Sequence, residues 1–426
     1  MKRITKAGTA GAAALAVAAA GVAGCGPAGA GPGAAAAGPG PAVRVSAGQL
    51  RSSVAAGYLF LGQMMDRYAT GTVPRLVQSF TGGPLGQQRF TASETYDDAL
   101  VIDAYLASDR PADRSRAAVI ANGLLYAQAH DPRHDGRLRA AYAPTPLRRP
   151  ADVTVTDPAS LAGNMAWAGQ ALVRVYAATG RTAYLTAAEA IGSWVQAHCR
   201  DTRGPGGYTG GETASGQKIE WKSTEHNIDL YALFSMLAAE TGNPAWSARA
   251  AWARSFVARM WDPRPGRFYV GTTADGATPN DSVLPEDVNS WSYLALRDRR
   301  YAASVAWNVR NLTVSAGGFT GVSFCRASRT GIWYEGTAHL ADALEFRGQP
   351  GDAAQAGRYL AALYHAQARG PGTDRRGIIA ASRDGLPDCG GGTFSGSLHT
   401  GTTAWYILAA RKVNPFAVPP ARPRPR

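Results

Sequence analysis

Cysteine, lysine and long apolar runs are scarce in this chain of 426 residues. Four cysteines are too few for a small disulfide-rich scaffold. No apolar run of about 18 residues follows position 25, so we expect no membrane span in the mature chain. The sequence also lacks a GxxxxGK phosphate loop, an HExxH motif, a GxSxG elbow and a dinucleotide-binding fingerprint. These absences argue against nucleotide-dependent, metalloprotease and serine-hydrolase chemistry.

The net charge is basic, and almost all of the excess is arginine. Lys and Arg number 44 against 31 Asp and Glu, yet only five of the cations are lysines. Three cations lie in the first six residues and three in the last five, which leaves about +7 for the rest of the chain. A nucleic-acid groove would need a basic block interleaved with aromatic residues, and none is present. We therefore expect no nucleic-acid partner.

The first 48 residues are typical of an exported, anchored protein. Lys2, Arg3 and Lys6 precede an apolar segment over 10–21 that is too short to span a bilayer. The sequence VAGC, ending at Cys25, resembles a bacterial lipobox, in which the cysteine carries a lipid after cleavage; the alternative is an ordinary signal peptide with an incidental cysteine. We expect a signal peptide over 1–24 and a Gly/Ala/Pro tether over 25–48. The protein would then be extracytoplasmic, attached to the outer face of the membrane by lipid alone.

The other three cysteines are interpreted in the light of that location. Outside the cell two of them can pair, and Cys325 and Cys389 both fall in long predicted loops. We expect these two to form a disulfide and Cys199, at the end of a predicted helix, to be a buried free thiol. The cysteines lack the spacing of a zinc site, so we expect no metal. A zinc site of Cys325, Cys389 and His399 is the alternative.

Twelve helical patterns alternate with loops from residue 50 onward. They cover residues 50–69, 94–108, 111–130, 158–178, 182–200, 225–241, 244–261, 286–298, 300–314, 335–346, 351–367 and 402–411. Short turns follow every second helix and long loops precede it, so the helices should form hairpins whose long loops share one face. Similar polar and aromatic starts recur roughly every 50 to 70 residues, a period that indicates a closed or stacked array. Short β-hairpins are expected inside the long loops, for example at 267–271.

These features predict an all-α (α/α)6 toroid over 49–413, followed by a Pro/Arg-rich tail over 414–426. Residues 50–412 resemble the six-hairpin toroid glycosidases, a group that includes glucoamylase-like and endoglucanase-like enzymes. The resemblance rests on the hairpin count, on YDD at 96–98, STEHNID at 223–229 and WYEG at 333–336, and on many loop aromatics. It implies an active cleft at the N-terminal ends of the inner helices, with two carboxylates acting as acid and base.

Acidic residues gather at the expected starts of the inner helices. They are Glu94, Asp97, Asp98, Glu225, Asp229, Glu286, Asp287 and Glu335. Acids in a first helical turn also stabilise the helix itself, so part of this set should be structural. Thr91 and Glu94 have the spacing of a capping box, and Glu286 follows Pro285 at a first helical position. We expect Glu94 and Glu286 to serve the helices rather than the chemistry.

Glu225 is the expected general acid. It follows two capping candidates, and Asp229 lies four residues on along the same helix face. Polar groups this dense on an otherwise apolar helix are costly to bury unless a cleft or ligand satisfies them. Asp229 is expected to orient Glu225, and an apolar wall containing Trp221 to raise its pKa.

Glu335 is the expected partner carboxylate, because it lies between two aromatic residues and Gly336, which permits close approach to the backbone. Asp97 and Asp98 compete for the same role, and only one of two neighbours on a helix can face the ring interior. We expect that one to be Asp98. Asp287 is a further candidate base.

The remaining candidates would bind sugar. Aromatic rings stack on the apolar faces of sugars, and polar side chains bind their hydroxyl groups. The candidates are Tyr96, Asn164, Trp221, His226, Asp229, Trp291, Trp333, Tyr334 and His399.

The leading interpretation is a monomeric, cofactor-free glycoside hydrolase that acts on a polysaccharide or oligosaccharide. A polysaccharide lyase or sugar epimerase on the same toroid is the nearest alternative, with His226, His399, Tyr96 or Tyr334 as the proton acceptor. A non-catalytic, carbohydrate-binding envelope lipoprotein is a third.

Overall fold

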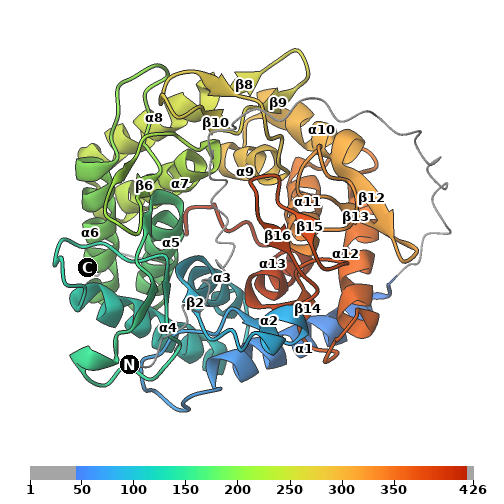
Figure 1. The fold of residues 1–426 in the computed structure, drawn as a ribbon, viewed down its shortest axis with the longest axis horizontal. Coiled ribbons are helices and arrows are strands. Elements are labelled where there is room, and N and C mark those ends of the chain that lie inside the picture. The colour runs from blue at the N-terminus through green and yellow to red at the C-terminus, as the bar shows by residue number, and fades with distance from the viewer. Residues whose placement is uncertain (1–44, 420–426) are drawn as a thin grey trace, which may run out of the picture.

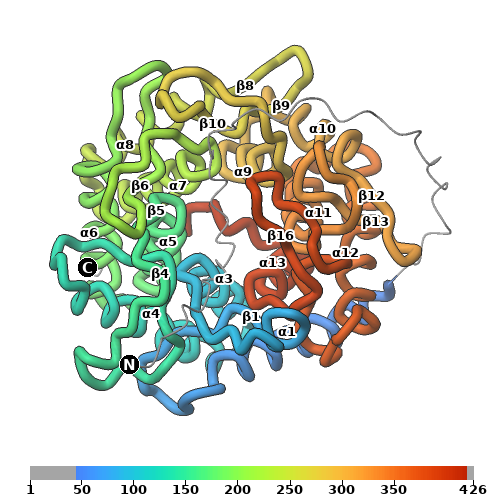
Figure 2. Tube along the Cα trace, viewed as in Figure 1, coloured from blue at the N-terminus to red at the C-terminus, as the bar shows by residue number. Residues whose placement is uncertain are grey.

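The computed structural model describes residues 45–419, and twelve of the helices in this range form two concentric rings (Figures 1 and 2). The inner ring consists of α3 (Thr95–Leu106), α5 (Ala162–Thr179), α7 (Thr224–Thr241), α9 (Asp287–Leu296), α11 (Tyr334–Arg347) and α13 (Thr400–Arg411). The outer ring consists of α1 (Ala47–Met65), α4 (Pro111–Ala129), α6 (Thr182–His198), α8 (Pro244–Arg259), α10 (Ala302–Leu312) and α12 (Asp352–Arg369). This is the (α/α)6 toroid that the sequence predicts.

Packing between consecutive inner helices closes the ring. Each inner helix contacts the next, and α13 returns to contact α3. The first helix, α1, packs against α13 and so completes the sixth hairpin, as predicted. Short turns separate the helices of a hairpin because α5, α7 and α11 end at Gly180, Gly242 and Gly348, each in the left-handed conformation that stops a helix.

Short antiparallel strands occupy the long loops. Three of them lead directly into inner helices: β2 (Ser93–Glu94) into α3, β5 (Ser160–Leu161) into α5 and β17 (Leu398–His399) into α13. The others are β1 (Phe80–Thr81), β3 (Ala141–Tyr142), β4 (Val155–Asp157), β6 (Gly211–Glu212), β7 (Lys218–Ile219), β8 (Trp261–Asp262), β9 (Arg267–Phe268), β10 (Gly271–Thr272), β11 (Pro279–Asn280), β12 (Thr313–Ala316), β13 (Phe319–Val322), β14 (Ile378–Ile379), β15 (Leu386–Pro387) and β16 (Thr393–Phe394). The hairpin expected near 267–271 is β8–β9. A short helix, α2 (Gly83–Gln87), and two 3-10 turns, Pro150–Asp152 and Arg299–Tyr301, complete the elements.

The folded part continues past the expected boundary at 413. Asn414 is buried and donates to the carbonyl of Leu294, 2.8 Å away, at the end of α9. The buried Phe416 ring packs within the inner ring, 5.1 Å from the ring of Trp167 and 5.5 Å from that of Trp291. The segment after α13 therefore belongs to the core of the toroid.

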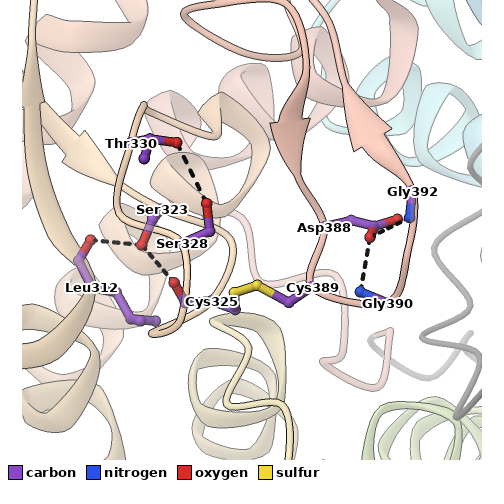
Figure 3. The surroundings of a disulfide bond; sticks show 9 residues. All are labelled: Leu312, Ser323, Cys325, Ser328, Thr330, Asp388, Cys389, Gly390 and Gly392. Atoms are coloured by element: carbon purple, nitrogen blue, oxygen red, sulfur yellow. Dashed lines mark hydrogen bonds between the residues drawn. A yellow bond between two sulfur atoms is a disulfide. The ribbon is translucent and has the colours of Figure 1, made fainter. Parts of the chain in front are cut away.

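The predicted disulfide is present between Cys325 and Cys389 (Figure 3). It joins the loop that precedes α11 to the β15–β16 hairpin, which precedes α13. Because the two sulfur atoms are bonded to each other, they are not available as the zinc ligands of the alternative interpretation. Cys199 is free and buried, as expected, and burial raises the pKa of its thiol to about 12.

The signal peptide, Cys25 and most of the tether lie outside the described residues, as does the end of the tail. Within 45–419, no helix combines the length and the apolar character needed to cross a bilayer.

Candidate active site

A cluster of carboxyl groups lies at the N-terminal ends of the inner helices. All eight of the acids predicted there are buried: Glu94, Asp97, Asp98, Glu225, Asp229, Glu286, Asp287 and Glu335. Within residues 45–419 none of them forms an ion pair with a lysine or arginine. Asp97, Glu286 and Glu335 pair instead with His339 or His399. The site is thus a set of acidic groups with two imidazoles among them.

Glu335, in the first turn of α11, lies between both imidazoles. Its Oε1 accepts a hydrogen bond from the Tyr96 hydroxyl at 2.7 Å and is 3.7 Å from Nε2 of His339, while its Oε2 is 3.4 Å from Nδ1 of His399. Trp405 donates to the same tyrosine oxygen at 2.8 Å and so fixes the hydroxyl. Burial alone would raise the pKa of Glu335, but His339 and His399 outweigh it and hold that pKa below its usual value.

His399 is held in place by strand pairing and by stacking. It ends β17, where it pairs with Phe80 of β1 and Ile378 of β14, and its ring stacks on that of Phe80 at 4.1 Å. Nε2 lies 3.3 Å from Oδ2 of Asp97. A Cβ on Gly401 would overlap Oδ1 of that aspartate, so a glycine is required for this close approach.

Nδ1 of His399 has three polar neighbours. It lies 2.9 Å from the hydroxyl oxygen of Thr402 and 3.2 Å from the amide nitrogen of the same residue, which it caps at the start of α13. It also lies 3.4 Å from the Glu335 carboxylate. An unprotonated nitrogen can accept from the amide, and a protonated one can pair with the carboxylate. Burial disfavours the charged ring, but the negative charges of Asp97 and Glu335 outweigh burial and raise the pKa of His399 to about 9. The charged ring is therefore favoured at neutral pH, with Asp97 and Glu335 as its carboxylate neighbours.

The expectation that Asp98 faces the ring interior is wrong. Oδ1 of Asp98 accepts from the amide of Val77 and Oδ2 from the hydroxyl of Ser93, which ties this carboxyl to the loop outside the ring. Burial raises its pKa well above the usual value. Asp97 is the neighbour that reaches His399, because the turn of α3 places successive side chains about 100° apart.

Glu94 and Glu286 also differ from expectation. The helix α3 begins after β2, so Glu94 takes the N-cap position without a side-chain capping bond, and Thr91 does not cap the helix. Glu286 is fully buried and lies 3.1 Å from Nδ1 of His339. Both carboxyl groups therefore belong to the cluster, although the sequence assigned them to helix ends.

Glu225 has the opposite electrostatic character to Glu335. Burial, reinforced by the nearby Asp287, Asp229 and Glu335 carboxyls, raises the pKa of Glu225 well above its usual value. Burial likewise raises the pKa of Asp287 to about 7, and raises that of Asp229 well above the usual range. Neighbouring His226 is nearly inaccessible, and burial lowers its pKa to about 4, so this ring is neutral.

Six candidates at the starts of five inner helices retain 4 to 7% of their surface exposed. They are Glu94, Tyr96, Asn164, Glu225, Tyr334 and His399. Trp221 is half-buried, with its ring 5.6 Å from that of His226. These residues form the part of the site that a ligand can reach first.

Trp291 and Trp333, expected to stack on sugar, have no exposed surface. Trp291 packs 5.3 Å from Trp167 and 5.8 Å from Trp405, and Trp333 packs 4.8 Å from Phe324. A large ring is most stable where its whole apolar area is removed from water. Trp291 thus packs inside the ring, and Trp333 belongs to the loop cluster around the disulfide. The prediction of direct sugar contact is wrong for both rings in this structure.

Sequence reasoning preferred Asp98 to Asp97, assigned Glu286 to its helix and gave His339 no place in the cluster. The spacing of Glu335 and His339 places both on one helix face and could have indicated the pair. The contact of His339 with Glu286 joins two different helices and has no signal in the sequence.

No protein-family model matches the chain, and no curated protein matches it. Solved structures do match. A D-mannose isomerase is 10% identical with a TM-score of 0.63, over 86% of this chain and 96% of that one. A cellobiose 2-epimerase from Bacillus thermoamylovorans is 10% identical with a TM-score of 0.64, over 85% and 97%. A family 76 glycoside hydrolase from a bovine Bacteroides thetaiotaomicron strain is 12% identical with a TM-score of 0.57, over 85% and 77%.

At such identities these likenesses concern the fold. They establish that the chain has the toroid shared by sugar isomerases, sugar epimerases and glycoside hydrolases.

Proposed function

We propose that the protein is a carbohydrate-active enzyme, and specifically a glycoside hydrolase. One observation carries the proposal: two buried carboxyl groups of the same site, Glu225 and Glu335, have pKa values shifted in opposite directions. Glycosidic cleavage needs one carboxyl that keeps its proton and one that has lost it. Environments that separate two such pKa values are a common mark of an acid and base pair.

In the proposed reaction Glu225 donates its proton to the glycosidic oxygen as the bond to carbon breaks. Glu335 is the base that takes a proton from the attacking water. Its Oε2 is buried and lies 3.4 Å from Nδ1 of His399, and a carboxylate oxygen has two lone pairs, so one acceptor position is left for that water. Tyr96 and His399, which contact this carboxylate and retain some exposure, would contact the sugar.

The charge of the site favours an uncharged or cationic sugar. A uronate would enter a site that contains the ionised Glu335, and none of the eight acids there has a lysine or arginine partner within residues 45–419 that could bind the uronate carboxylate. Like charges in a partly desolvated site repel strongly. The same argument disfavours a lyase acting on a uronate polymer.

We also propose that the enzyme works as a monomer outside the cytoplasm, attached to the membrane through Cys25. The lipobox resemblance of VAGC supports the anchor. The Cys325–Cys389 disulfide supports an oxidising compartment, because such bonds are rare where thiols are kept reduced.

A sugar epimerase or isomerase is the second candidate. His399 and Tyr96 are partly exposed and are both held by Glu335, an arrangement in which either could exchange a proton with a sugar carbon. Two of the structures with the same fold are a D-mannose isomerase and a cellobiose 2-epimerase.

The test is a screen of neutral, amino-sugar and acidic glycans with residues 44–426, comparing wild type with Glu225→Gln and Glu335→Gln. Hydrolysis by the wild type would produce new reducing ends. The rate at which they form should fall by roughly 10²-fold or more in each variant. Glu220→Gln, an exposed loop position, is the matched control and should keep full activity. Epimerisation would instead incorporate deuterium from solvent without new reducing ends. Binding without turnover in all proteins would contradict an enzymatic role.

A further inference from the structure

Five side chains at or near the starts of four inner helices form a continuous alternation of carboxylates and imidazoles. Asp97 is 3.3 Å from Nε2 of His399, whose Nδ1 is 3.4 Å from Glu335. Glu335 is 3.7 Å from Nε2 of His339, whose Nδ1 is 3.1 Å from Glu286. We call this row, from Asp97 to Glu286, the acid–histidine chain.

The far end of the chain has no exposed surface. Both Glu286 and His339 are fully buried. Oε1 of Glu286 accepts from Ser290 Oγ and, at 3.0 Å, from Asn308 Nδ2, so its other oxygen is directed to His339. The proposed reaction gives neither residue a direct role.

A buried imidazole between two carboxylates gains stability for its charged form from both. The charged His339 in turn stabilises the ionised form of Glu335, and His399 does the same from the other side. Removing Glu286 would therefore weaken the charge on His339 and, through it, the ionisation of Glu335.

We propose that Glu286 and His339 are positioning residues, which act through the acid–histidine chain to keep Glu335 ionised and oriented toward Tyr96 and His399. The role of Glu335 as a base rests on the proposed function. The charge coupling along the chain does not, and it can be measured without a substrate.

Other titratable groups face the same residues. His339 interacts electrostatically with Asp287 and Asp342. Glu335 interacts in the same way with Glu94, Glu225 and Asp287. Glu286 interacts with Tyr359. Asp342 lies three residues after His339 on α11 and accepts no hydrogen bond from a described residue. Burial raises the pKa of this carboxyl well above its usual value and so favours its uncharged form. Asp342→Asn is therefore the matched control: it removes a buried carboxyl beside His339, as Glu286→Gln does, but one whose uncharged form is favoured.

The experiment follows the protonation of both histidines by nitrogen-15 NMR between about pH 5 and 10, which spans the usual histidine pKa of about 6.5 and the raised values expected here. In the wild type, His339 should be doubly protonated at neutral pH, since burial is outweighed by Glu286 and Glu335 and its pKa is raised to about 9. In Glu286→Gln the pKa of His339 should fall by roughly 1 to 3 units. Asp342→Asn should leave it within about half a unit of wild type.

A neutral His339 in the wild type at pH 7 would overturn the proposal, and this result requires no variant. Equal shifts in Glu286→Gln and Asp342→Asn would overturn it as well, because the effect would then be structural. If Glu286→Gln does not fold, Glu286→Asp keeps the charge and should keep His339 protonated.

Once a substrate is known, the acid limb of kcat/KM should move to higher pH in Glu286→Gln. An unchanged limb with shifted histidines would contradict the base role of Glu335 and leave the coupling standing.

Discussion

Burial by itself does not decide the charge of a carboxyl group in this ring. Glu225 and Glu335 are both removed from solvent, yet the first has carboxyl neighbours and the second has two imidazoles. Desolvation disfavours the ionised form of both groups, and only the charges within a few ångströms separate them. The chemical roles we propose therefore depend on which side chains meet at the ring centre.

Asp287→Asn should change the pH dependence of turnover. Asp287 is the first neighbour, after burial, that raises the pKa of Glu225. Removing its negative charge makes ionisation of Glu225 easier, so the pKa of Glu225 falls and its proton is lost at lower pH. The alkaline limb of the kcat/KM profile should move to lower pH by about 1 unit.

The measurement is a pH–rate profile with the substrate that the glycan screen identifies. Asp342→Asn, which removes a buried carboxyl that is not among the neighbours of Glu225, should retain the wild-type limb. An unmoved alkaline limb in Asp287→Asn would show that Glu225 is not the proton donor.

At the scale of elements, short strands place the functional residues at the starts of the helices. β2 ends at Glu94 and β17 ends at His399, and each pairs with strands from distant loops before its helix begins. Strand pairing fixes the backbone entering a helix more firmly than a free loop does. Side chains in the first turn of α3 and α13 are consequently held together across the ring.

The disulfide should stabilise these loops. It closes a segment of 64 residues and ties the loop before α11 to the hairpin before α13. Replacing Cys325 and Cys389 together by serine should cost about 2–5 kcal/mol in the free energy of unfolding. Urea denaturation with and without a reducing agent measures this. Reductant should lower the midpoint of the wild type and leave that of the double variant unchanged; equal midpoints throughout would contradict the expectation.

At the scale of the whole molecule, the ring is completed by the segment that follows its last helix. Phe416 lies 5.1 Å, 5.5 Å and 6.5 Å from the rings of Trp167, Trp291 and Trp405, which come from three inner helices. These tryptophans lie beneath the carboxyl cluster, since Trp405 bonds Tyr96 and the ring of Trp291 is 5.0 Å from that of His339. The C-terminal segment therefore supports the floor of the site.

Phe416→Ala should cost about 3–5 kcal/mol in the free energy of unfolding, the usual range for emptying a large buried site. Thermal and urea unfolding measure the change. Val418→Ala, two residues on and 44% exposed, is the control and should be within about 0.5 kcal/mol of wild type. Similar values for both variants would mean that the segment does not stabilise the ring.

The sequence by itself determined the twelve helices, their pairing and the face that carries the long loops. Periodicity and loop length are local properties, and they placed α3, α7 and α11 within a few residues of their actual bounds. The disulfide followed from two cysteines in long loops, and Glu225 and Glu335 from acids at helix starts.

Only the tertiary structure decided which side chains meet. Asp97 rather than Asp98 faces His399, Glu286 contacts His339, and Trp291 packs beneath the site, all because of the rotation of each helix about its own axis. That rotation is set by packing between helices far apart in the sequence, and the first-turn preferences of Asp and Glu are the same whichever way a helix faces. The acid–histidine chain is therefore a property of the closed ring, with no counterpart in any single segment.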